Sequence, residues 1–321
     1  MGLALGLEMG WEMGAGRWDS LGLEMGWERR ALLMILKSKR YAALFLFPAL
    51  AFILIFLIIP LFRTIYYSLT KWYNFSPRQE FILFKNYQDI FSDRIVHIAL
   101  KNTGAMIVGV LLFQIVLALA LAICADSASH GFRFFRTVFF FPIVISATAI
   151  GLMFSLIYKY DYGLLNYLME LLGLERRVWL TKESALFMVL IPICWQYVGF
   201  YFVIFLTGIA KIPEDIYESA RLDGIRPLQK VLYITIPMLK DIIVSNLVLV
   251  VSGCFRVFDM IYIVTGGGPL NASELLSSYM YRKAFMDYNV GYASAIAIAM
   301  IVIGLSLTGV LRAAANRIQG E

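Results

Sequence analysis

Charged side chains gather around an Asp-Gly dipeptide in an otherwise apolar chain. Glu218, Arg221 and Asp223 lie just before Gly224, between two hydrophobic runs that are each long enough to cross a bilayer. Such side chains can form ion pairs and hydrogen bonds with another surface. The sequence has no cluster of Asp, His or Cys of the kind a membrane enzyme or a metal site needs. We therefore expect no catalytic residue and no metal ligand here.

A second pair of charges, Arg256 and Asp259, lies deep within a hydrophobic run. Charged residues inside a membrane are costly and normally face the protein interior or a cavity. Their i, i+3 spacing places both residues on the same face of a helix. Two interpretations stay open. The residues form a structural ion pair, or Arg256 borders a translocation path and favours substrates that carry carboxylate groups.

Aromatic and amide side chains gather in another hydrophobic run, in the segment WQYVGFY at 195–201. Binding sites for sugars combine aromatic faces, which cover C–H surfaces, with a few polar groups that hold hydroxyls. The segment is therefore a candidate binding surface. The alternative is ordinary packing of aromatic side chains between helices.

Long hydrophobic runs must position all these residues. The chain has 321 residues, of which 60% are hydrophobic, whereas soluble domains are about 45–50% apolar. A bilayer core needs about 20 apolar residues as helix, because lipid offers the backbone no hydrogen bonds. Six runs reach that length: 42–62, 103–124, 137–158, 185–210, 242–263 and 291–311. The sequence predicts an all-α integral membrane protein with six transmembrane helices over residues 34–321.

The two ends of the chain lie on the same side of the membrane if six helices cross it. The basic cluster KSKR at 37–40 directly precedes the first run and favours cytoplasmic termini. Residues 1–33 contain the repeat LGLEMGWE and lack the features of a signal peptide. We expect a disordered tail there, with a later natural start such as Met25 or Met34 as the alternative.

The segment 211–241, between the fourth and fifth runs, is predicted to hold two short helices joined at Gly224. Pro213 suits a first helical turn, glycine just past a helical run is a typical C-terminal cap, and Pro227 suits the start of a second helix. In that second helix one apolar stripe is expected, made of Leu228, Val231, Leu232, Thr235, Ile236 and Leu239. An interfacial helix that lies on the membrane is the alternative to a loop that docks into a partner.

The same segment carries a resemblance to a known family. Its sequences ESARLDG at 218–224 and ITIP at 234–237 resemble the EAA loop, E-A-A-x-x-D-G followed by I-T-L-P, of permease subunits of binding-protein-dependent ABC importers. Ser219 and Ile236 are mild departures. TGGGP at 265–269 and GYASA at 291–295 are similar to segments of the carbohydrate-importer branch, which includes maltose, lactose and glycerol-phosphate permeases. The ordered set of matching segments extends over about residues 40–312.

The resemblance implies that 211–241 is a cytoplasmic coupling loop seated in a cleft of an ATP-hydrolysing subunit. The residues it assigns to that contact are Glu218, Ala220, Asp223, Gly224, Ile225 and Pro237. The chain itself has no GxxxxGK[ST] phosphate loop. ATP and magnesium are therefore expected on the partner, and no cofactor is expected on this chain.

The resemblance to the maltose permease also places substrate contacts on two of the runs. They fall at Gln196, Tyr197 and Phe200, and near Val250, Gly253, Cys254 and Val257. With Arg256 these residues form the predicted translocation path. The residue types differ from those of the maltose permease, so an oligosaccharide other than maltose is the expected substrate.

Several partners are implied, because six spans form half of a transport pathway. The resemblance implies a second related permease, two ATP-binding subunits and a periplasmic or surface solute-binding protein, all at a bacterial inner membrane. The net charge of +6 accompanies no nucleic-acid motif. The alternative function is an ion-gradient-driven secondary sugar transporter. That class normally shows paired half-repeats and intramembrane acids, whereas here only Asp259 lies within a predicted span.

Overall fold

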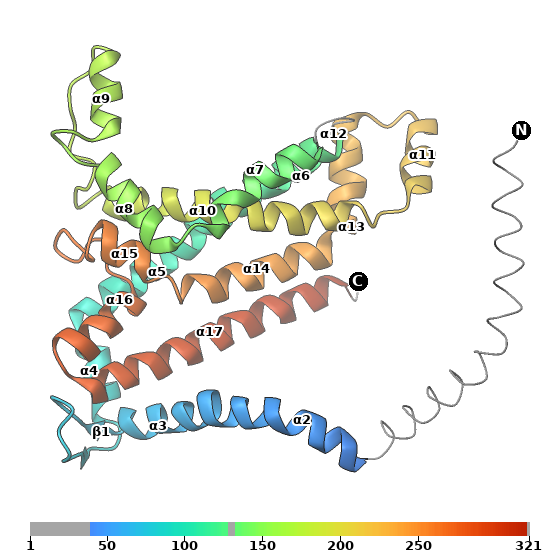
Figure 1. Ribbon diagram of the computed structural model, residues 1–321. Coiled ribbons are helices and arrows are strands. Elements are labelled where there is room, and N and C mark those ends of the chain that lie inside the picture. The colour runs from blue at the N-terminus through green and yellow to red at the C-terminus, as the bar shows by residue number, and fades with distance from the viewer. Residues whose placement is uncertain (1–38, 128–131, 320–321) are drawn as a thin grey trace, which may run out of the picture. The chain divides into compact units, whose positions relative to one another are not determined.

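The computed structural model describes residues 39–127 and 132–319 (Figure 1). The chain divides into two compact units, Met1–Arg63 and Thr64–Glu321. The predictions made for the tail 1–33 concern residues outside those described.

The described part of the first unit is one long helix, which runs on into the second unit. It consists of α2 (Lys39–Ile53), the π-helical turn η1 (Leu54–Ile58) and α3 (Ile59–Ser68). Pro48 lies inside α2 without ending it. Residues Leu44–Ser68 are long and apolar enough to cross a membrane, as the first hydrophobic run predicts.

The second unit is helical apart from a two-stranded antiparallel sheet of β1 (Thr70–Lys71) and β2 (Glu80–Phe81). Its first helices are α4 (Lys85–Ser92), α5 (Arg94–Val110), η2 (Leu111–Ile115), α6 (Val116–Ser127), α7 (Phe132–Val144), α8 (Ala147–Ile157), α9 (Leu164–Leu171) and α10 (Ala185–Ile209). They are followed by α11 (Glu214–Leu222), α12 (Pro227–Lys230), η3 (Val231–Thr235), α13 (Ile236–Met238), α14 (Lys240–Cys254), α15 (Asp259–Val264), α16 (Leu276–Tyr281), η4 (Arg282–Met286) and α17 (Val290–Gln319).

In the described residues, four helices are long and apolar enough to cross a membrane, or up to six if each bent pair of helices counts as one span. Three long helices of the second unit qualify alone: Arg94–Asp126, Ala185–Ile209 and Val290–Ala315. The pairs α7–α8 and α12/α13–α14 qualify together but are bent by 91° and 69°. The predicted third span, 137–158, is thus not one straight helix. Hydropathy counts apolar residues and carries no information about the break at Ser146, where the backbone leaves the helical region.

The predicted fifth span, 242–263, is also broken. Helix α14 ends at Cys254, and residues 255–258 are not helical before the short α15 begins. The sequence prediction of a continuous helix here is wrong. As a consequence, the predicted common helix face of Arg256 and Asp259 does not exist.

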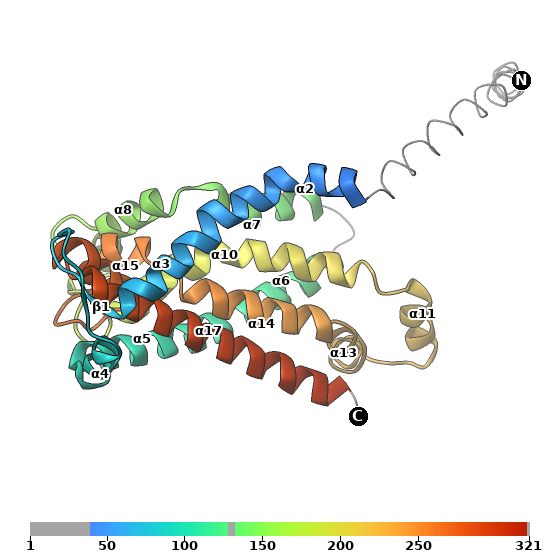
Figure 2. The same ribbon diagram turned by 90° about the horizontal axis from the view of Figure 1, so that it is seen from below.

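Helix α10 forms the centre of the second unit (Figures 1 and 2). Phe202 and Phe205 on this helix are 0% exposed and belong to a hydrophobic core shared with α5, α6 and α14. Gly199 allows α7 to approach closely, because a Cβ atom at this position would lie 1.7 Å from the Phe139 carbonyl oxygen. Any larger residue would force the two helices apart.

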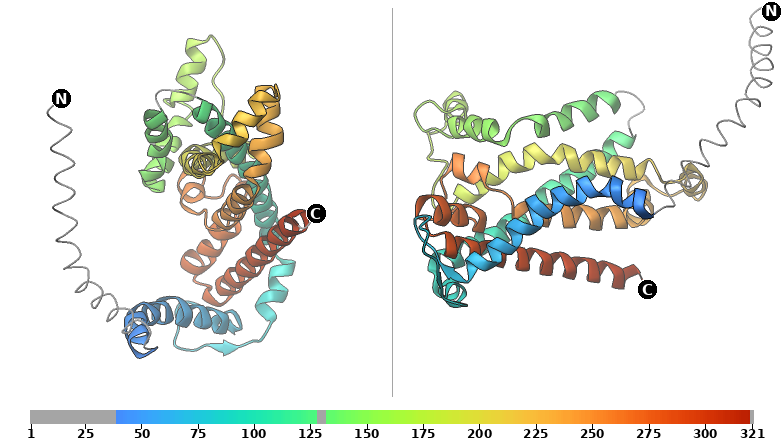
Figure 3. Two further views of the ribbon diagram at one scale, coloured as in Figure 1. Left: turned by 90° about the vertical axis from the view of Figure 1, so that its right-hand side faces the viewer. Right: turned by 60° about the horizontal axis from the view of Figure 1, so that its bottom comes forward.

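The two ends of the second unit differ in structure (Figure 3). At one end lie α12, α13 and the last turns of α17, and α11 projects beyond them. At the opposite end, α4, α9, α15 and α16 form an irregular cap with β1. The long helices connect these ends, so residues at the middle of α10 and α14 are remote from both.

Candidate functional site

A cavity of about 440 Å³ lies between the helices of the second unit. Residues of α10, α14 and the broken segment after α14 form most of its lining, together with residues of α5, η2, α7 and α8. The lining includes every residue of the predicted translocation path: Gln196, Tyr197, Phe200, Val250, Gly253, Cys254, Arg256 and Val257. The structure therefore brings together side chains from two hydrophobic runs that the sequence could place only separately.

Gln196 is the amide residue of this lining that the sequence analysis singled out. Its side chain is 3% exposed, and its Nε2 donates a hydrogen bond of 3.1 Å to the carbonyl oxygen of Ile145, at the break between α7 and α8. Its Oε1 has no hydrogen-bond partner among the described residues. A buried amide oxygen without a partner costs about 1–3 kcal/mol, so this oxygen is kept free at the expense of stability.

Gln114 is a lining residue that the sequence analysis missed. It is 1% exposed, lies in the π-helical turn η2, and its Oε1 also has no hydrogen-bond partner among the described residues. A glutamine inside an otherwise apolar run, 103–124, was a usable signal, because polar residues within a membrane span normally face an interior site. π-Helical turns inside α-helices also occur often at functional sites.

Arg256 and Asp259 both line the cavity, and both side chains are exposed. In the described part of the chain they form no ion pair with each other, so the ion-pair interpretation is wrong. The helix break at 255–258 separates them, because i, i+3 neighbours face each other only within one helix. The cavity wall thus carries one cationic and one anionic group that are available to other ligands.

The predicted coupling loop contains the expected helix–glycine–helix. Gly224 adopts φ +70°, its N–H donates to the Arg221 carbonyl oxygen at 3.1 Å, and the Ile225 N–H donates to that of Ala220 at 3.1 Å. This pair of hydrogen bonds is the Schellman motif that ends a helix at a left-handed residue. Helix α12 begins after Arg226, whose N–H donates to Gln229 Oε1 at 3.1 Å.

The residues assigned to the partner contact have different exposures. Glu218, Asp223, Gly224 and Pro237 are exposed, and Ile225 is half-buried. Ala220 is 5% exposed and lies on the same inward face as Tyr217. Its assignment to the partner contact stays a prediction.

The predicted apolar stripe in the second half of the loop is only partly buried. Leu228 and Leu232 are 69% and 50% exposed, whereas Thr235 and Leu239 are buried. Val231 and Ile236 are half-buried. Tyr217 joins the two halves: its hydroxyl lies 3.3 Å from Thr235 Oγ1, and Lys230 Nζ lies 4.5 Å from its ring centroid.

A cluster of paired carboxylates lies at the end opposite α11, and we call it the carboxylate cluster. Asp93 Oδ2 accepts hydrogen bonds from the hydroxyls of Tyr279 at 2.5 Å and Tyr292 at 2.8 Å. Burial acts to raise the pKa of Asp93, but these hydrogen bonds and those from backbone N–H groups outweigh it, so the pKa lies below its ordinary value. The cluster thereby ties the start of α5 to α16 and α17.

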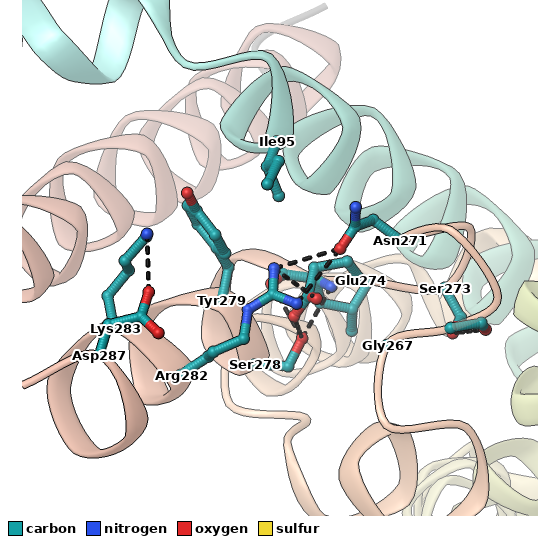
Figure 4. Close-up of polar contacts among 12 residues, drawn as sticks. Ile95, Gly267, Asn271, Ser273, Glu274, Ser278, Tyr279, Arg282, Lys283 and Asp287 are labelled. Atoms are coloured by element: carbon teal, nitrogen blue, oxygen red, sulfur yellow. Dashed lines mark hydrogen bonds and ion pairs between the residues drawn. The ribbon is translucent and has the colours of Figure 1, made fainter.

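Glu274 is the second acid of the carboxylate cluster (Figure 4). Its side chain is 2% exposed, accepts a hydrogen bond of 2.6 Å from Ser278 Oγ, and forms an ion pair of 3.0 Å with Arg282. Burial raises the pKa of Glu274, although Ser278 and Arg282 both act to lower it. The sequence analysis did not identify either acid of this cluster, because their partners lie far away in the chain.

Comparisons with known proteins place this architecture in a family. Residues 114–320 match the family model described as the inner membrane component of binding-protein-dependent transport systems. The chain belongs to this family. It is 41% identical over 280 residues to the probable ABC transporter permease protein YurN of Bacillus subtilis, covering 86% of this chain and 96% of YurN.

Further relatives agree with this assignment. The permease is 32% identical over 274 residues to the trehalose/maltose transport system permease protein MalF of Thermococcus litoralis, covering 85% of this chain and 92% of that protein. Its fold matches a chain from the crystal structure of a bacterial ABC transporter involved in the import of the acidic polysaccharide alginate, with a TM-score of 0.79 and 24% identity over 90% of this chain and 99% of the other. The resemblance to importer permeases is confirmed, and the family assignment leaves the ion-gradient-driven alternative without support.

Proposed function

We propose that this permease forms half of the translocation pathway of an ATP-driven importer for oligosaccharides. The cavity is the observation that carries the proposal. It joins aromatic side chains, Tyr197 and Phe200, to buried amides and to two charged groups, which is the combination that sugar sites use. The trehalose/maltose permease named above supports a sugar as the cargo.

Uptake by the complete assembly tests the proposal. The permease is reconstituted in proteoliposomes with the related permease, two ATP-binding subunits and the solute-binding protein that it requires. We expect vanadate-sensitive, ATP-dependent uptake of at least one saccharide from a panel of maltose, trehalose and longer neutral and uronate oligosaccharides. Uptake that continues without ATP and follows a proton gradient would contradict it.

The exposed corner of the loop, with Glu218, Asp223 and Gly224, receives the force of ATP hydrolysis in this proposal. It is supported by the position of α11 apart from the helices (Figure 2) and by the hydrogen bond between Tyr217 of α11 and Thr235 of η3. We expect Glu218→Lys to abolish both uptake and the stimulation of ATPase activity by the loaded binding protein. Glu80→Lys makes the same charge change on an exposed residue at the opposite end and should leave both unchanged.

The loop and both termini face the cytoplasm in this proposal. In a variant without native cysteines, Ser219→Cys introduces an exposed thiol beside Glu218. A membrane-impermeant maleimide should label it in lysed cells only. Labelling in intact cells would show that the loop faces the outside and would contradict this orientation.

Acidic oligosaccharides are a second candidate cargo, favoured by the position of Arg256. Its guanidinium lines the cavity without an ion pair to Asp259, so it is available to a carboxylate of the substrate. Arg256→Leu should then reduce uptake of uronate oligosaccharides at least tenfold more than uptake of neutral ones. An equal reduction in the uptake of uronate and neutral oligosaccharides would contradict the selection of acidic substrates by Arg256.

A further inference from the structure

The two buried amide oxygens in the cavity are its most unusual feature. Gln114 and Gln196 are 1% and 3% exposed, and neither Oε1 has a hydrogen-bond partner among the described residues. They come from different elements, η2 and α10, and both line the same cavity. Native proteins rarely leave such groups without partners, and each instance calls for a reason.

We infer that Gln114 and Gln196 form a pair of acceptors that selects hydrogen-bond donors on the passing sugar. This inference rests on the proposed function and assigns Gln114 to substrate contact. An amide oxygen accepts hydrogen bonds and cannot donate them. The two oxygens therefore require hydroxyl or N–H groups on the substrate, whatever its charge, and they leave recognition of a carboxylate to Arg256.

The π-helical turn η2 places Gln114 at the cavity. Val110, one turn earlier, also lines the cavity, and the next α-helix, α6, begins only after the π-helical turn. The extra residue of a π-helical turn rotates side chains relative to an uninterrupted α-helix. Two features that lower stability, an irregular turn and an amide oxygen without a partner among the described residues, thus coincide at a position that borders the cavity.

The amide nitrogen of Gln196 holds its side chain in place. Its Nε2 donates to the Ile145 carbonyl oxygen, a group that the break between α7 and α8 leaves without a helical partner. This bond fixes the orientation of the amide and leaves Oε1 as the free atom. Recognition by an amide held in this way discriminates strongly, because an analogue without the donor leaves the oxygen buried and unpaired.

A cycle of variants and substrate analogues tests this inference in the complete reconstituted importer. The probe is the saccharide of the panel above with the fastest uptake, compared with its monodeoxyfluoro derivatives. Fluorine replaces one hydroxyl at a time and removes its donor. For Gln114→Leu we expect KM for the parent saccharide to rise about tenfold, and KM for one fluoro derivative to change less than twofold. Because each variant is compared with the unmodified permease on the same sugar, selection by the binding protein cancels.

Gln114→Glu and Asn246→Leu keep the result interpretable. Gln114→Glu retains an acceptor oxygen and should keep the preference for the parent saccharide over that derivative. Asn246 is 0% exposed, has no partner for its amide among the described residues and does not line the cavity. Its replacement by leucine should affect all sugars equally.

The outcomes separate the inference from the proposed function. Equal effects of Gln114→Leu on the parent and on every fluoro derivative, with uptake intact, would overturn the selection by Gln114 and leave the importer function standing. Absence of saccharide uptake by the unmodified assembly would overturn both.

Discussion

Two regions of the second unit differ in whether their buried polar groups have partners. In the carboxylate cluster, Asp93 accepts hydrogen bonds from Tyr279 and Tyr292. Glu274 accepts one from Ser278 through Oε1, and its Oε2, which has no hydrogen bond among the described residues, forms the ion pair with Arg282. In the cavity, the amide oxygens of Gln114 and Gln196 have no partner among the described residues. Paired polar groups fix one arrangement of the helices, whereas unpaired ones stay available to a ligand. Under the proposed function, this difference corresponds to an end of the bundle that stabilises the fold and a middle that binds the substrate.

Removal of the cation beside Glu274 should have the largest effect on stability. Breaking a buried ion pair by removal of one partner costs about 3–5 kcal/mol. Because Arg282 is 31% exposed, we expect Arg282→Leu to cost about 3 kcal/mol, at the lower end of that range. Thermal unfolding of the detergent-solubilised assembly at neutral pH provides the measurement. A change below about 1 kcal/mol would mean that the pair does not hold the fold.

The loss from Arg282→Leu should also depend on pH. Burial raises the pKa of Glu274, and without Arg282 the acid is expected to take up a proton more readily still. The variant should therefore recover part of its stability as the pH falls. A loss that stays constant down to pH 4 would contradict an electrostatic origin.

Removal of one hydroxyl from Asp93 should have the next largest effect. Tyr279→Phe eliminates a hydrogen bond to a charged acceptor, which is worth about 1.5–3 kcal/mol. The folded pKa of Asp93 is below its ordinary value of 3.8, so the stabilisation is complete above that pH and is lost as the pH falls through the folded pKa. The stability difference between variant and unmodified protein should follow this profile in unfolding measurements.

Tyr281→Phe is a matched control for this effect, because the Tyr281 hydroxyl has no hydrogen bond among the described residues. We expect it to leave the stability and its pH profile unchanged. If both variants showed the same loss, packing of the rings would account for the effect of Tyr279→Phe.

The partly exposed ion pair next to the carboxylate cluster should matter less. Lys283 Nζ lies 2.7 Å from Asp287 Oδ2, with side chains 24% and 43% exposed. Pairs of this kind contribute about 0–1 kcal/mol and are screened by salt. Lys283→Leu should thus lower the unfolding temperature slightly in low salt and not at all in 1 M salt. A large effect at both salt concentrations would place Lys283 within the stabilising cluster.

Replacement of Gln114 in the cavity should cost the least stability. Leucine removes an amide oxygen that has no partner, so Gln114→Leu should leave the free energy of unfolding unchanged or raise it by up to about 1 kcal/mol. The same unfolding assay provides the test. A loss above 1 kcal/mol would show that Gln114 stabilises the fold, and the contrast between the two regions would fail.

The hydrophobic runs predicted most of the helices because apolar length and helix formation are linked in lipid. The ends of α10 at Ala185 and Ile209 lie within one residue of the predicted run. The loop motif predicted the cap at Gly224 for an equally local reason, because glycine has no Cβ and adopts a left-handed φ without steric cost. The breaks at Ser146 and after Cys254 were not predicted, because they depend on what packs against those segments.

The sequence by itself determined the class of the protein, the helix–glycine–helix loop and the set of residues from α10 and α14 that line the cavity. The class and the loop follow from local composition and a short motif, and the residues of α10 and α14 follow from the resemblance to the maltose permease. Only the tertiary structure decided that Arg256 and Asp259 are unpaired, that Ala220 faces inward, and that Gln114 joins Gln196 in one cavity. Those facts depend on contacts between segments far apart in the chain, and hydrophobicity, which has no direction, cannot specify them.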